Sequence, residues 1–212
     1  MSSDTEVTTE TKPAETKPAE TKPAETKPSE TKPAETKPAA KPAAKPAELP
    51  AFEKSISDKI VEKFGDKIEV EFVKENRVGI KVNRDDIHDV AEFIRDGLNY
   101  DHVESVSGVD YPQDKEIEVV YHIGSYSDSS LAKQLLVLAT RAQREENPIP
   151  GKDATKLPTL RDIFYSVEFH EREVFEMFGV YFTGHPDNRR LLLPEDWADL
   201  PPLRKDFAIK GR

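Results

Sequence analysis

The sequence contains no cysteine, so this chain can form neither disulfides nor cysteine-ligated iron–sulfur clusters, and it has no thiol nucleophile. It also lacks a long apolar run. Residues 135–139 are among the longest, far below the roughly eighteen residues that a membrane-spanning helix needs. The first ten residues lack the basic and then apolar pattern of a signal peptide. We therefore expect a cytosolic protein without direct membrane insertion.

Glycine and aromatic residues are absent from residues 1–50, which hold nine of the seventeen prolines. The pentad TKPAE recurs five times between Thr11 and Glu35, with Ser29 as the one variation. Such a segment has no apolar surface to offset the chain entropy lost on folding, and its regular prolines disfavour helices. The composition predicts a disordered, Pro-rich tail over residues 1–50.

The remaining 162 residues, 51–212, are enough for one domain with a core of its own. They carry most of the net charge, because 32 acidic residues face 23 basic ones in this part of the chain. Phosphate backbones are bound by basic surfaces. The charge balance therefore argues against nucleic acid as a main partner.

Apolar spacing predicts the first elements of this domain. Residues 52–64 place apolar side chains at every fourth position and end at Gly65, which is typical of an amphipathic helix with a glycine stop. Residues 67–73 and 77–82 alternate apolar and polar side chains around a polar turn, which indicates a hairpin. A second helix follows, with its apolar stripe in residues 87–94 and a cap at Asp85 or Asp86.

Further along, residues 102–112 and 115–126 are strand candidates around a turn. Residues 131–143 are ambiguous, since their residue types favour a helix but their apolar run is short. Thr159 can cap a short helix that ends at Tyr165.

Ser166 can cap another helix, from Val167 to Phe178, which Gly179 ends. The whole order predicts an α+β protein: a single compact domain with a small mixed or antiparallel sheet, flanking helices and an extended C-terminal segment.

The last predicted helix is rich in charge. Glu168, Arg172 and Glu176 recur at four-residue spacing, and the simplest interpretation is a solvated helix face worth a few tenths of a kcal/mol per pair. Glu171 instead shares its stripe with the apolar residues of that helix. A carboxylate at such a place needs a partner, and we expect an arginine from elsewhere in the domain.

Two histidines near this helix raise the possibility of a metal site. His170 and Glu171 begin the pattern HExxH, but Val174 stands where the second histidine would be. A metal-dependent hydrolase using His170, Glu173 and His185 stays open as a minor alternative. The sequence has no G-x-S-x-G nucleophile elbow, G-x-G-x-x-G motif or P-loop.

The last forty residues combine prolines with paired basic residues. His185, Pro186 and Asp187 suggest a rigid turn, and residues 189–190 and 204–206 are charged clusters in an acidic chain. Irregular, Pro-rich backbone of this kind commonly lies across another surface. That surface is either this chain's own domain or a partner protein.

One long string is specific to a family. Residues 171–197 read EREVFEMFGVYFTGHPDNRRLLLPEDW and residues 202–207 read PLRKDF. This pattern resembles the signature of the 30 kDa subunit of respiratory complex I, the C-type subunit of the bacterial proton-translocating NADH:quinone oxidoreductase. Three departures are visible: Glu176 replaces the usual aspartate, Asn188 replaces a leucine, and the spacing after Trp197 is one residue longer.

The resemblance implies an accessory subunit of a membrane-bound, proton-translocating complex, peripheral on the cytoplasmic face of the membrane. It implies contact with the 49 kDa-type subunit (the D-type subunit), with quinone reached only through the complex. Flavin and iron–sulfur clusters would lie in partner subunits, and this chain would hold no cofactor and no active site of its own. The implied partner-binding residues are Glu171, Arg172, Glu173, His185, Pro186, Arg189, Arg190, Arg204, Lys205 and Asp206.

The departures leave the electron donor open. NADH is the family's usual donor, and an archaeal relative that uses deazaflavin or ferredoxin, or a membrane hydrogenase, is the alternative. A third hypothesis is an adaptor outside any redox complex.

Overall fold

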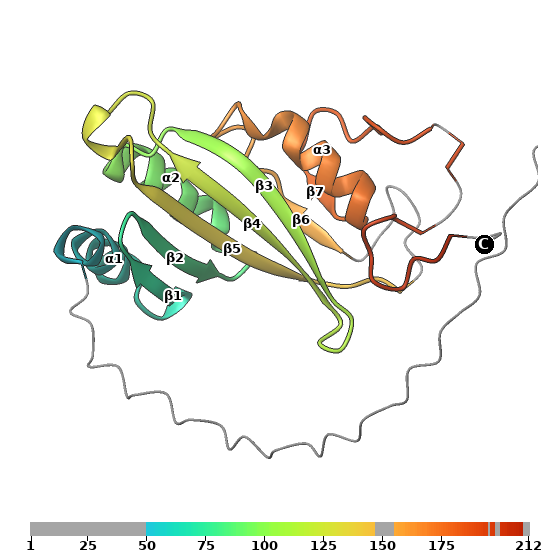
Figure 1. The fold of residues 1–212 in the computed structure, drawn as a ribbon, viewed down its shortest axis with the longest axis horizontal. Helices are drawn as coiled ribbons and strands as arrows, with labels where there is room; N and C mark the ends of the chain where they lie inside the picture. Colours follow the sequence, from blue (N-terminus) through green and yellow to red (C-terminus); the bar gives the residue numbers. More distant parts are fainter. Residues whose placement is uncertain (1–49, 147–154, 195, 198–199, 210–212) are drawn as a thin grey trace, which may run out of the picture. The chain divides into compact units, whose positions relative to one another are not determined.

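The computed structural model describes residues 50–146, 155–194, 196–197 and 200–209 (Figure 1). The predicted tail, residues 1–50, lies outside this part of the chain except for Pro50. The described elements are α1 (Ala51–Phe64), β1 (Ile68–Lys74), β2 (Arg77–Val82), α2 (Ile87–Leu98), β3 (His102–Tyr111), β4 (Glu116–Gly124), β5 (Leu135–Gln143), β6 (Lys156–Pro158), α3 (Val167–Phe178) and β7 (Tyr181–Thr183), with short 3-10 turns at Gly65–Lys67 and Ser129–Leu131.

The main sheet has five strands in the order β1-β2-β5-β4-β3. Two antiparallel hairpins, β1–β2 and β3–β4, flank β5, which pairs parallel with β2 and antiparallel with β4. The sheet is therefore mixed, and the predicted α+β class is confirmed.

The ambiguous residues 131–143 contain the central strand of this sheet, because β5 covers Leu135–Gln143. Leu136, Leu138 and Ala142 alternate into the core with exposed fractions of 4% or less. Residues 136–140 are all buried, so both faces of the strand are covered, which explains why its apolar run is nearly continuous.

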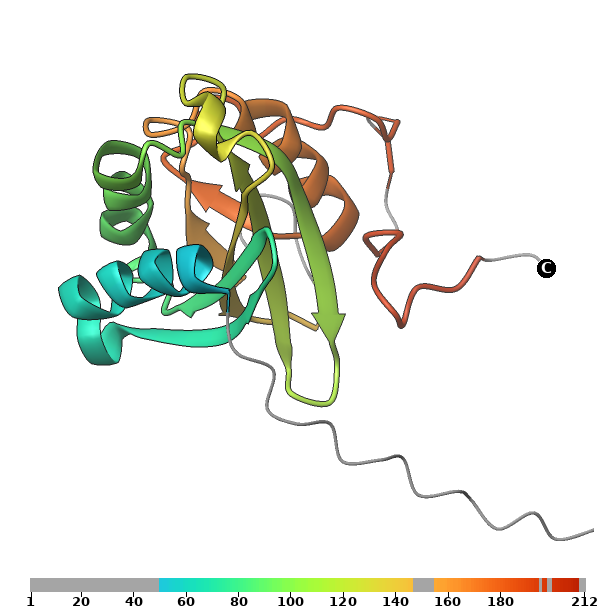
Figure 2. The same cartoon turned by 60° about the vertical axis from the view of Figure 1, so that its left-hand side comes forward.

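One core cluster unites the three helices with alternate residues of the main sheet. Helix α1 lies beside β1 and β2 and contacts α2, whereas α3 lies beside β3 (Figures 1 and 2). The close approach of α3 to β3 depends on Gly108, because a Cβ built there would lie 2.5 Å from the ring of Phe178. A larger residue at Gly108 would push the helix away from the sheet.

Two of the three predicted capping residues, Asp86 and Ser166, occupy the predicted positions, but their side chains bind elsewhere. Asp86 precedes α2 without a side-chain cap bond, and its carboxylate accepts a hydrogen bond from Lys67 Nζ at 2.6 Å. Ser166 precedes α3, and its hydroxyl accepts the backbone N–H of Val103 at 3.1 Å. Ser166 thus joins the start of α3 to β3.

The segment before α3 corrects one prediction. Residues 159–165 form turns and no helix, because the N–H groups of Ile163 and Phe164 both bond to Leu160 O and the pattern goes no further. The strands β6 and β7, which precede and follow α3 in the sequence, pair in parallel. Neither strand was predicted from the sequence. At three residues each, they are too short for an alternating pattern to show.

Candidate functional site

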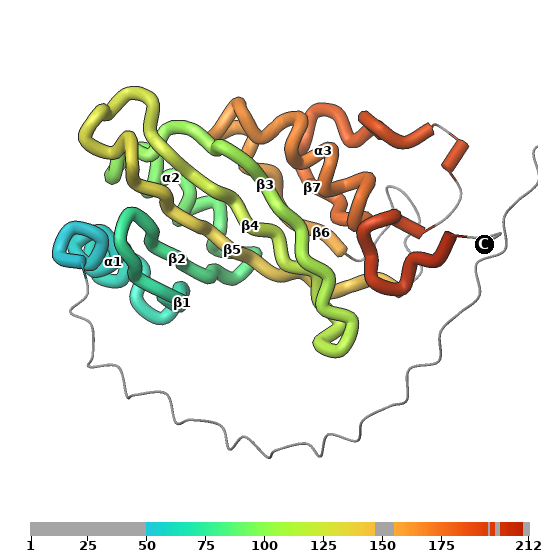
Figure 3. Tube along the Cα trace, in the orientation of Figure 1, coloured from blue at the N-terminus to red at the C-terminus, as the bar shows by residue number. Residues whose placement is uncertain are grey.

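Helix α3 is the centre of the site. Its bounds match the prediction, and Gly179, with φ 77°, ends it in the left-handed conformation that glycine favours. Val167, Val174 and Phe178 bury one face of the helix in the core. The rest of the helix carries charged side chains, several of which extend toward the C-terminal segment. This segment comprises the described residues after β7, which are 184–194, 196–197 and 200–209, and Figure 3 traces it beside α3.

Glu171 is fully buried, and no arginine of the described residues is its partner, so that prediction is wrong. One carboxylate oxygen accepts hydrogen bonds from Tyr121 Oη at 3.1 Å and from the backbone N–H of Leu160 at 2.9 Å. The other accepts the Thr159 hydroxyl at 2.5 Å. Hydroxyl and amide groups donate the hydrogen bonds to the Glu171 carboxylate that a guanidinium was expected to donate.

These donors do not fully offset the burial of Glu171. Loss of solvation raises the pKa of this carboxyl from 4.5 to about 7, although the bonds from Leu160, Thr159 and Tyr121 oppose the rise. The group therefore titrates near neutral pH. Such a value is common at functional sites, and it also occurs in purely structural networks.

His185 closes the network from the C-terminal side. Its ring is inaccessible to solvent, with Nε2 3.0 Å from Glu168 O and Nδ1 3.0 Å from the backbone N of Asp187. A carbonyl only accepts and a backbone N–H only donates, so this assigns the proton to Nε2. The predicted turn at residues 185–187 is thus held by its own histidine.

The charged ladder of α3 is not a solvated face, and that interpretation is corrected. Glu168 pairs with Arg161 at 3.0 Å. Arg172 donates to the backbone carbonyls of residues 189 and 190, both at 3.0 Å. Glu176 is buried and accepts three backbone N–H groups, those of residues 191–193. The i, i+4 spacing serves contacts with another segment, which helix periodicity does not reveal.

Further contacts fix the turn and the segment after it. Asp187 forms a two-bond pair with Arg189, at 2.8 and 2.9 Å, and this pair holds the Asp187 pKa below its usual range. Arg190 donates to Pro194 O at 2.9 Å and to Trp197 O at 2.6 Å. The basic pair at 189–190 therefore orders its own segment.

The cluster at residues 204–206 anchors the end of the described chain. Arg204 is only 2% exposed and donates to Phe178 O at 2.6 Å and to Glu145 O. The Lys205 backbone N–H bonds to Asp110 Oδ2 at 2.9 Å, and Asp206 pairs with Arg144 at 2.7 Å.

The C-terminal segment thus lies across this chain's own domain, as one of the two sequence interpretations expected. Arg144 also bonds to Asp110, at 2.7 Å, which connects the segment to β3. Whether the segment also meets a partner depends on what it displays to solvent.

The remaining predicted residues do not form a metal site. Across the described ranges, no group of three or more His, Cys, Asp or Glu side chains lies close enough to hold a metal ion. Both ring nitrogens of His185 are engaged, while Glu173 is exposed on α3. The residues of the hydrolase alternative, with His170, are therefore not assembled.

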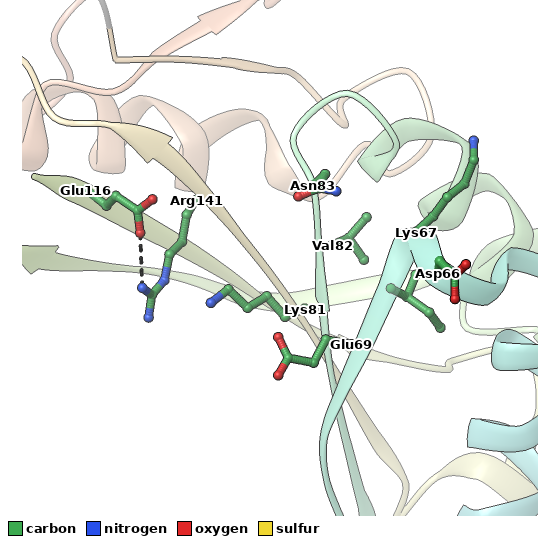
Figure 4. Close-up of a pocket in the computed structure, with 9 residues that line it drawn as sticks. Asp66, Lys67, Glu69, Lys81, Val82, Asn83, Glu116 and Arg141 are labelled. Carbon is green, nitrogen blue, oxygen red and sulfur yellow. Dashed lines mark hydrogen bonds and ion pairs between the residues drawn. The ribbon is translucent and has the colours of Figure 1, made fainter. Parts of the chain in front are cut away.

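A polar groove of about 420 Å³ crosses the main sheet where β1 and β4 begin and β2 and β5 end (Figure 4). Glu69, Lys81, Glu116 and Arg141 reach it from four strands, and Arg141 is held by Glu116 at 3.0 Å and Glu118 at 2.8 Å. Its lining mixes both signs of charge. It contains none of the residues predicted from the sequence.

Exposed apolar side chains gather around α3 and the C-terminal segment. Of nine large hydrophobic residues that are exposed in the described chain, six lie in this region. They are Tyr165, Phe169, Leu191, Leu192, Leu203 and Ile209. The sequence contained two signals for them, since Phe169 lies on the polar side of α3 and three consecutive leucines follow a charged pair.

An α+β domain that anchors its C-terminal segment by polar bonds, yet exposes apolar side chains around it, is typical of a protein that works within a larger assembly. A sequence profile described as "Respiratory-chain NADH dehydrogenase, 30 Kd subunit" matches residues 80–212. The chain belongs to this family, which confirms the resemblance in the signature residues.

Named relatives come from several complexes. The C-type subunit of the F420H2 dehydrogenase of Methanosarcina mazei is 36% identical over 131 residues, which are 62% of this chain and 75% of that protein. The C-type subunit of the NADH-quinone oxidoreductase of Chlorobium phaeobacteroides is 35% identical over 156 residues, 72% of this chain and 87% of that protein.

Two further relatives bear on assembly. The C/D-type subunit of NADH-quinone oxidoreductase from Phocaeicola vulgatus is 34% identical over 128 residues, 60% of this chain but 22% of that longer protein. A solved chain of the membrane-bound sulfane sulfur reductase, an archaeal respiratory membrane complex, is 29% identical with a TM-score of 0.61. That comparison covers 74% of this chain and 86% of the solved one.

Proposed function

We propose that this chain is an accessory, peripheral-arm subunit of a membrane-bound, proton-translocating NADH:quinone oxidoreductase-type complex, and that it binds the D-type subunit. The observation that carries the proposal is the group of exposed apolar side chains around α3 and the C-terminal segment, within the residues that the family profile matches. The relative whose name joins the C and D types supports the D-type subunit as the partner.

The site of action in the cell follows from the same proposal. No described helix is long and apolar enough to cross a membrane. One relative is part of an archaeal respiratory membrane complex, and we propose that this chain is held at the cytoplasmic face of such a complex by its partner subunits.

The predicted partner-binding residues divide by burial. Glu171, Arg172, His185 and Arg204 are buried or nearly so, and they act by holding the shape of the segment. Arg190 acts in the same way through its bonds to carbonyls. The exposed members that would touch the partner directly are Glu173, Pro186, Arg189, Lys205 and Asp206.

Co-purification tests the proposal. The full chain is co-expressed with the D-type subunit of its own organism, and we expect a stable complex. Phe169→Asp should prevent its formation, because the Phe169 ring is 59% exposed on α3. Phe52→Asp is the matched control, since Phe52 is 47% exposed on α1, outside the surface. If the wild-type chain forms no complex, or if both variants act alike, the assignment of the partner surface is wrong.

We also propose that the flavin and the iron–sulfur clusters of the complex lie in its other subunits and that electrons reach quinone there. The lack of cysteine supports this for iron–sulfur clusters. The test is the absorption spectrum and iron content of the washed chain, and a visible band or stoichiometric iron would refute the proposal.

The Methanosarcina mazei relative favours a second electron donor as strongly as the Chlorobium phaeobacteroides relative favours NADH. We therefore keep a deazaflavin-dependent or ferredoxin-dependent complex as the alternative. Quinone reduction by the purified complex with NADH, reduced deazaflavin or reduced ferredoxin as donor distinguishes them.

A further inference from the structure

Two side chains of α3 hold the backbone of residues 189–193. Arg172 lies one helical turn before Glu176, so both point to the same side. The Arg172 guanidinium donates to two consecutive carbonyls, Arg189 O and Arg190 O, each at 3.0 Å. Its side chain is only 12% exposed, so these bonds form where water competes weakly.

Glu176 continues the contact along the same backbone. Its carboxylate accepts the N–H groups of Leu191 at 3.0 Å, Leu192 at 2.8 Å and Leu193 at 3.1 Å. Five consecutive residues are thereby bound through their backbone by two oppositely charged side chains. Hydrogen bonds to a charged group are the stronger kind, so the conformation of this loop is fixed by α3.

The fixed backbone forces apolar side chains outward. Leu192 is 61% exposed and Leu191 is 40% exposed. Neither can turn into the domain without breaking bonds to Glu176, although leaving a leucine in water is unfavourable. Strong anchoring of a backbone combined with exposed leucines is expected of a loop that docks into another protein.

We propose that Arg172 and Glu176 are positioning residues that pre-organise residues 189–193, and that Leu192 inserts into an apolar pocket of the D-type subunit. This inference rests on the proposed function, and it identifies Leu192 as the anchor residue of the proposed partner surface. An apolar pocket fits Leu192, because both charges within the loop are already engaged in this chain: Arg189 by two bonds to Asp187, and Arg190 by bonds to Pro194 O and Trp197 O. Pre-organisation lowers the ordering entropy that binding would otherwise cost.

The first test measures the dissociation constant of the full chain and the D-type subunit. Leu192→Asp should weaken binding by about thirty-fold or more, the effect of an interface hot spot, and leave the melting temperature of the free chain unchanged. The matched control is Val61→Asp, at an exposed residue of α1. Unchanged affinity of the Leu192 variant, with a wild-type chain that binds, would overturn this inference alone. A wild-type chain that does not bind would overturn the proposed function as well.

The second test addresses the positioning role. In Glu176→Gln the amide protons of residues 191–193 should exchange faster in the free chain, and affinity should fall about tenfold. Glu62→Gln, at an exposed carboxylate of α1, is the control. Because Glu176 acts through Leu192, the double variant should bind no more weakly than Leu192→Asp alone. Independent, additive losses, or unchanged amide exchange, would refute the positioning role. The Leu192 test remains decisive if the Glu176 variant fails to fold.

Discussion

Glu171 and His185 face each other in the core, with a carboxylate oxygen 4.0 Å from Nε2 and both side chains inaccessible to solvent. The hydrogen bonds of His185 assign it a neutral ring, so it supplies no positive charge. Asp162 adds a weak repulsion and tends to raise the Glu171 pKa further. Among the described residues, the buried carboxylate therefore depends on hydrogen bonds from Tyr121, Thr159 and Leu160.

This arrangement predicts a specific dependence of stability on pH. Because the pKa of Glu171 rises from 4.5 to about 7 on folding, the folded chain keeps this proton at pH values where the unfolded chain loses it. The contribution to stability is present below about pH 4.5 and declines as pH rises to about 7, by about 3 kcal/mol in all. Urea unfolding of the wild type and of Glu171→Gln isolates it, since other groups cancel in the difference.

We expect the wild type to lose stability relative to the Gln variant as pH rises from about 4.5 to about 7. A carbon NMR titration of the Glu171 carboxyl gives the midpoint directly and does not require the variant to fold. A midpoint below about 4.5 would show that the three donors outweigh burial.

Neighbouring basic residues should differ sharply in their effect on stability. Arg204→Ala leaves the carbonyls of Phe178 and Glu145 without their guanidinium donor in a buried place. We expect a loss of about 2–4 kcal/mol in the free energy of unfolding. Lys205→Ala, at an exposed side chain, should unfold like the wild type. Equal effects in chemical denaturation would show that Arg204 does not anchor the segment.

Charge reversal at Arg189 and at Arg190 should distinguish direct contact with the partner from local ordering of the segment. Arg189→Glu should change the melting temperature little, since an ion pair at a side chain that is 85% exposed contributes little to stability, but it should weaken co-purification with the D-type subunit. Arg190→Glu removes the donors to Pro194 O and Trp197 O. The Arg190→Glu variant should therefore also be cleaved faster by proteases between Arg190 and Arg204. A complex that tolerates both reversals would exclude the pair from the interface.

The Pro-rich tail gives a prediction from composition. A chain that begins at Pro50 should melt at the same temperature as the full chain, because residues 1–49 contain no aromatic side chain and few aliphatic ones that could be buried. Differential scanning calorimetry of the two chains is the measurement. A decrease of several degrees on removal would show that the tail packs on the domain.

The sequence predicted the elements whose apolar period is long. The ranges of α1, α2 and α3 and the two hairpins follow from side-chain spacing together with Gly65 and Gly179, which are local signals. Residues 131–143 stayed ambiguous because β5 is buried on both of its faces, and such a strand does not alternate apolar with polar residues. The parallel pairing of β2 with β5 is a long-range choice that no local pattern encodes.

For the site, the sequence identified the right segment but not its contacts. The signature located Glu171 and Arg172, yet the partners of Glu171 come from β4 and from the turn before α3. Those partners are a tyrosine, a threonine and a backbone amide, which are abundant in any chain and carry no charge signal. Glu176 was assigned to a solvated face because periodicity describes a helix and not the loop that packs against it.

The central place of β5 also has a consequence for the order of folding. Both hairpins contain only contacts close in sequence, so they can form within microseconds, whereas β2 and β5 pair residues as far apart as Arg77 and Leu135. During synthesis the two hairpins leave the ribosome first and remain separate until residues 135–143 emerge. We expect pulse-labelled amides of β1–β2 and β3–β4 to gain protection before those that join β2 to β5, and simultaneous protection would contradict this order. Until then the inner edges of β2 and β4 are open and can pair with another chain, and the arrival of one nine-residue strand covers both edges at once.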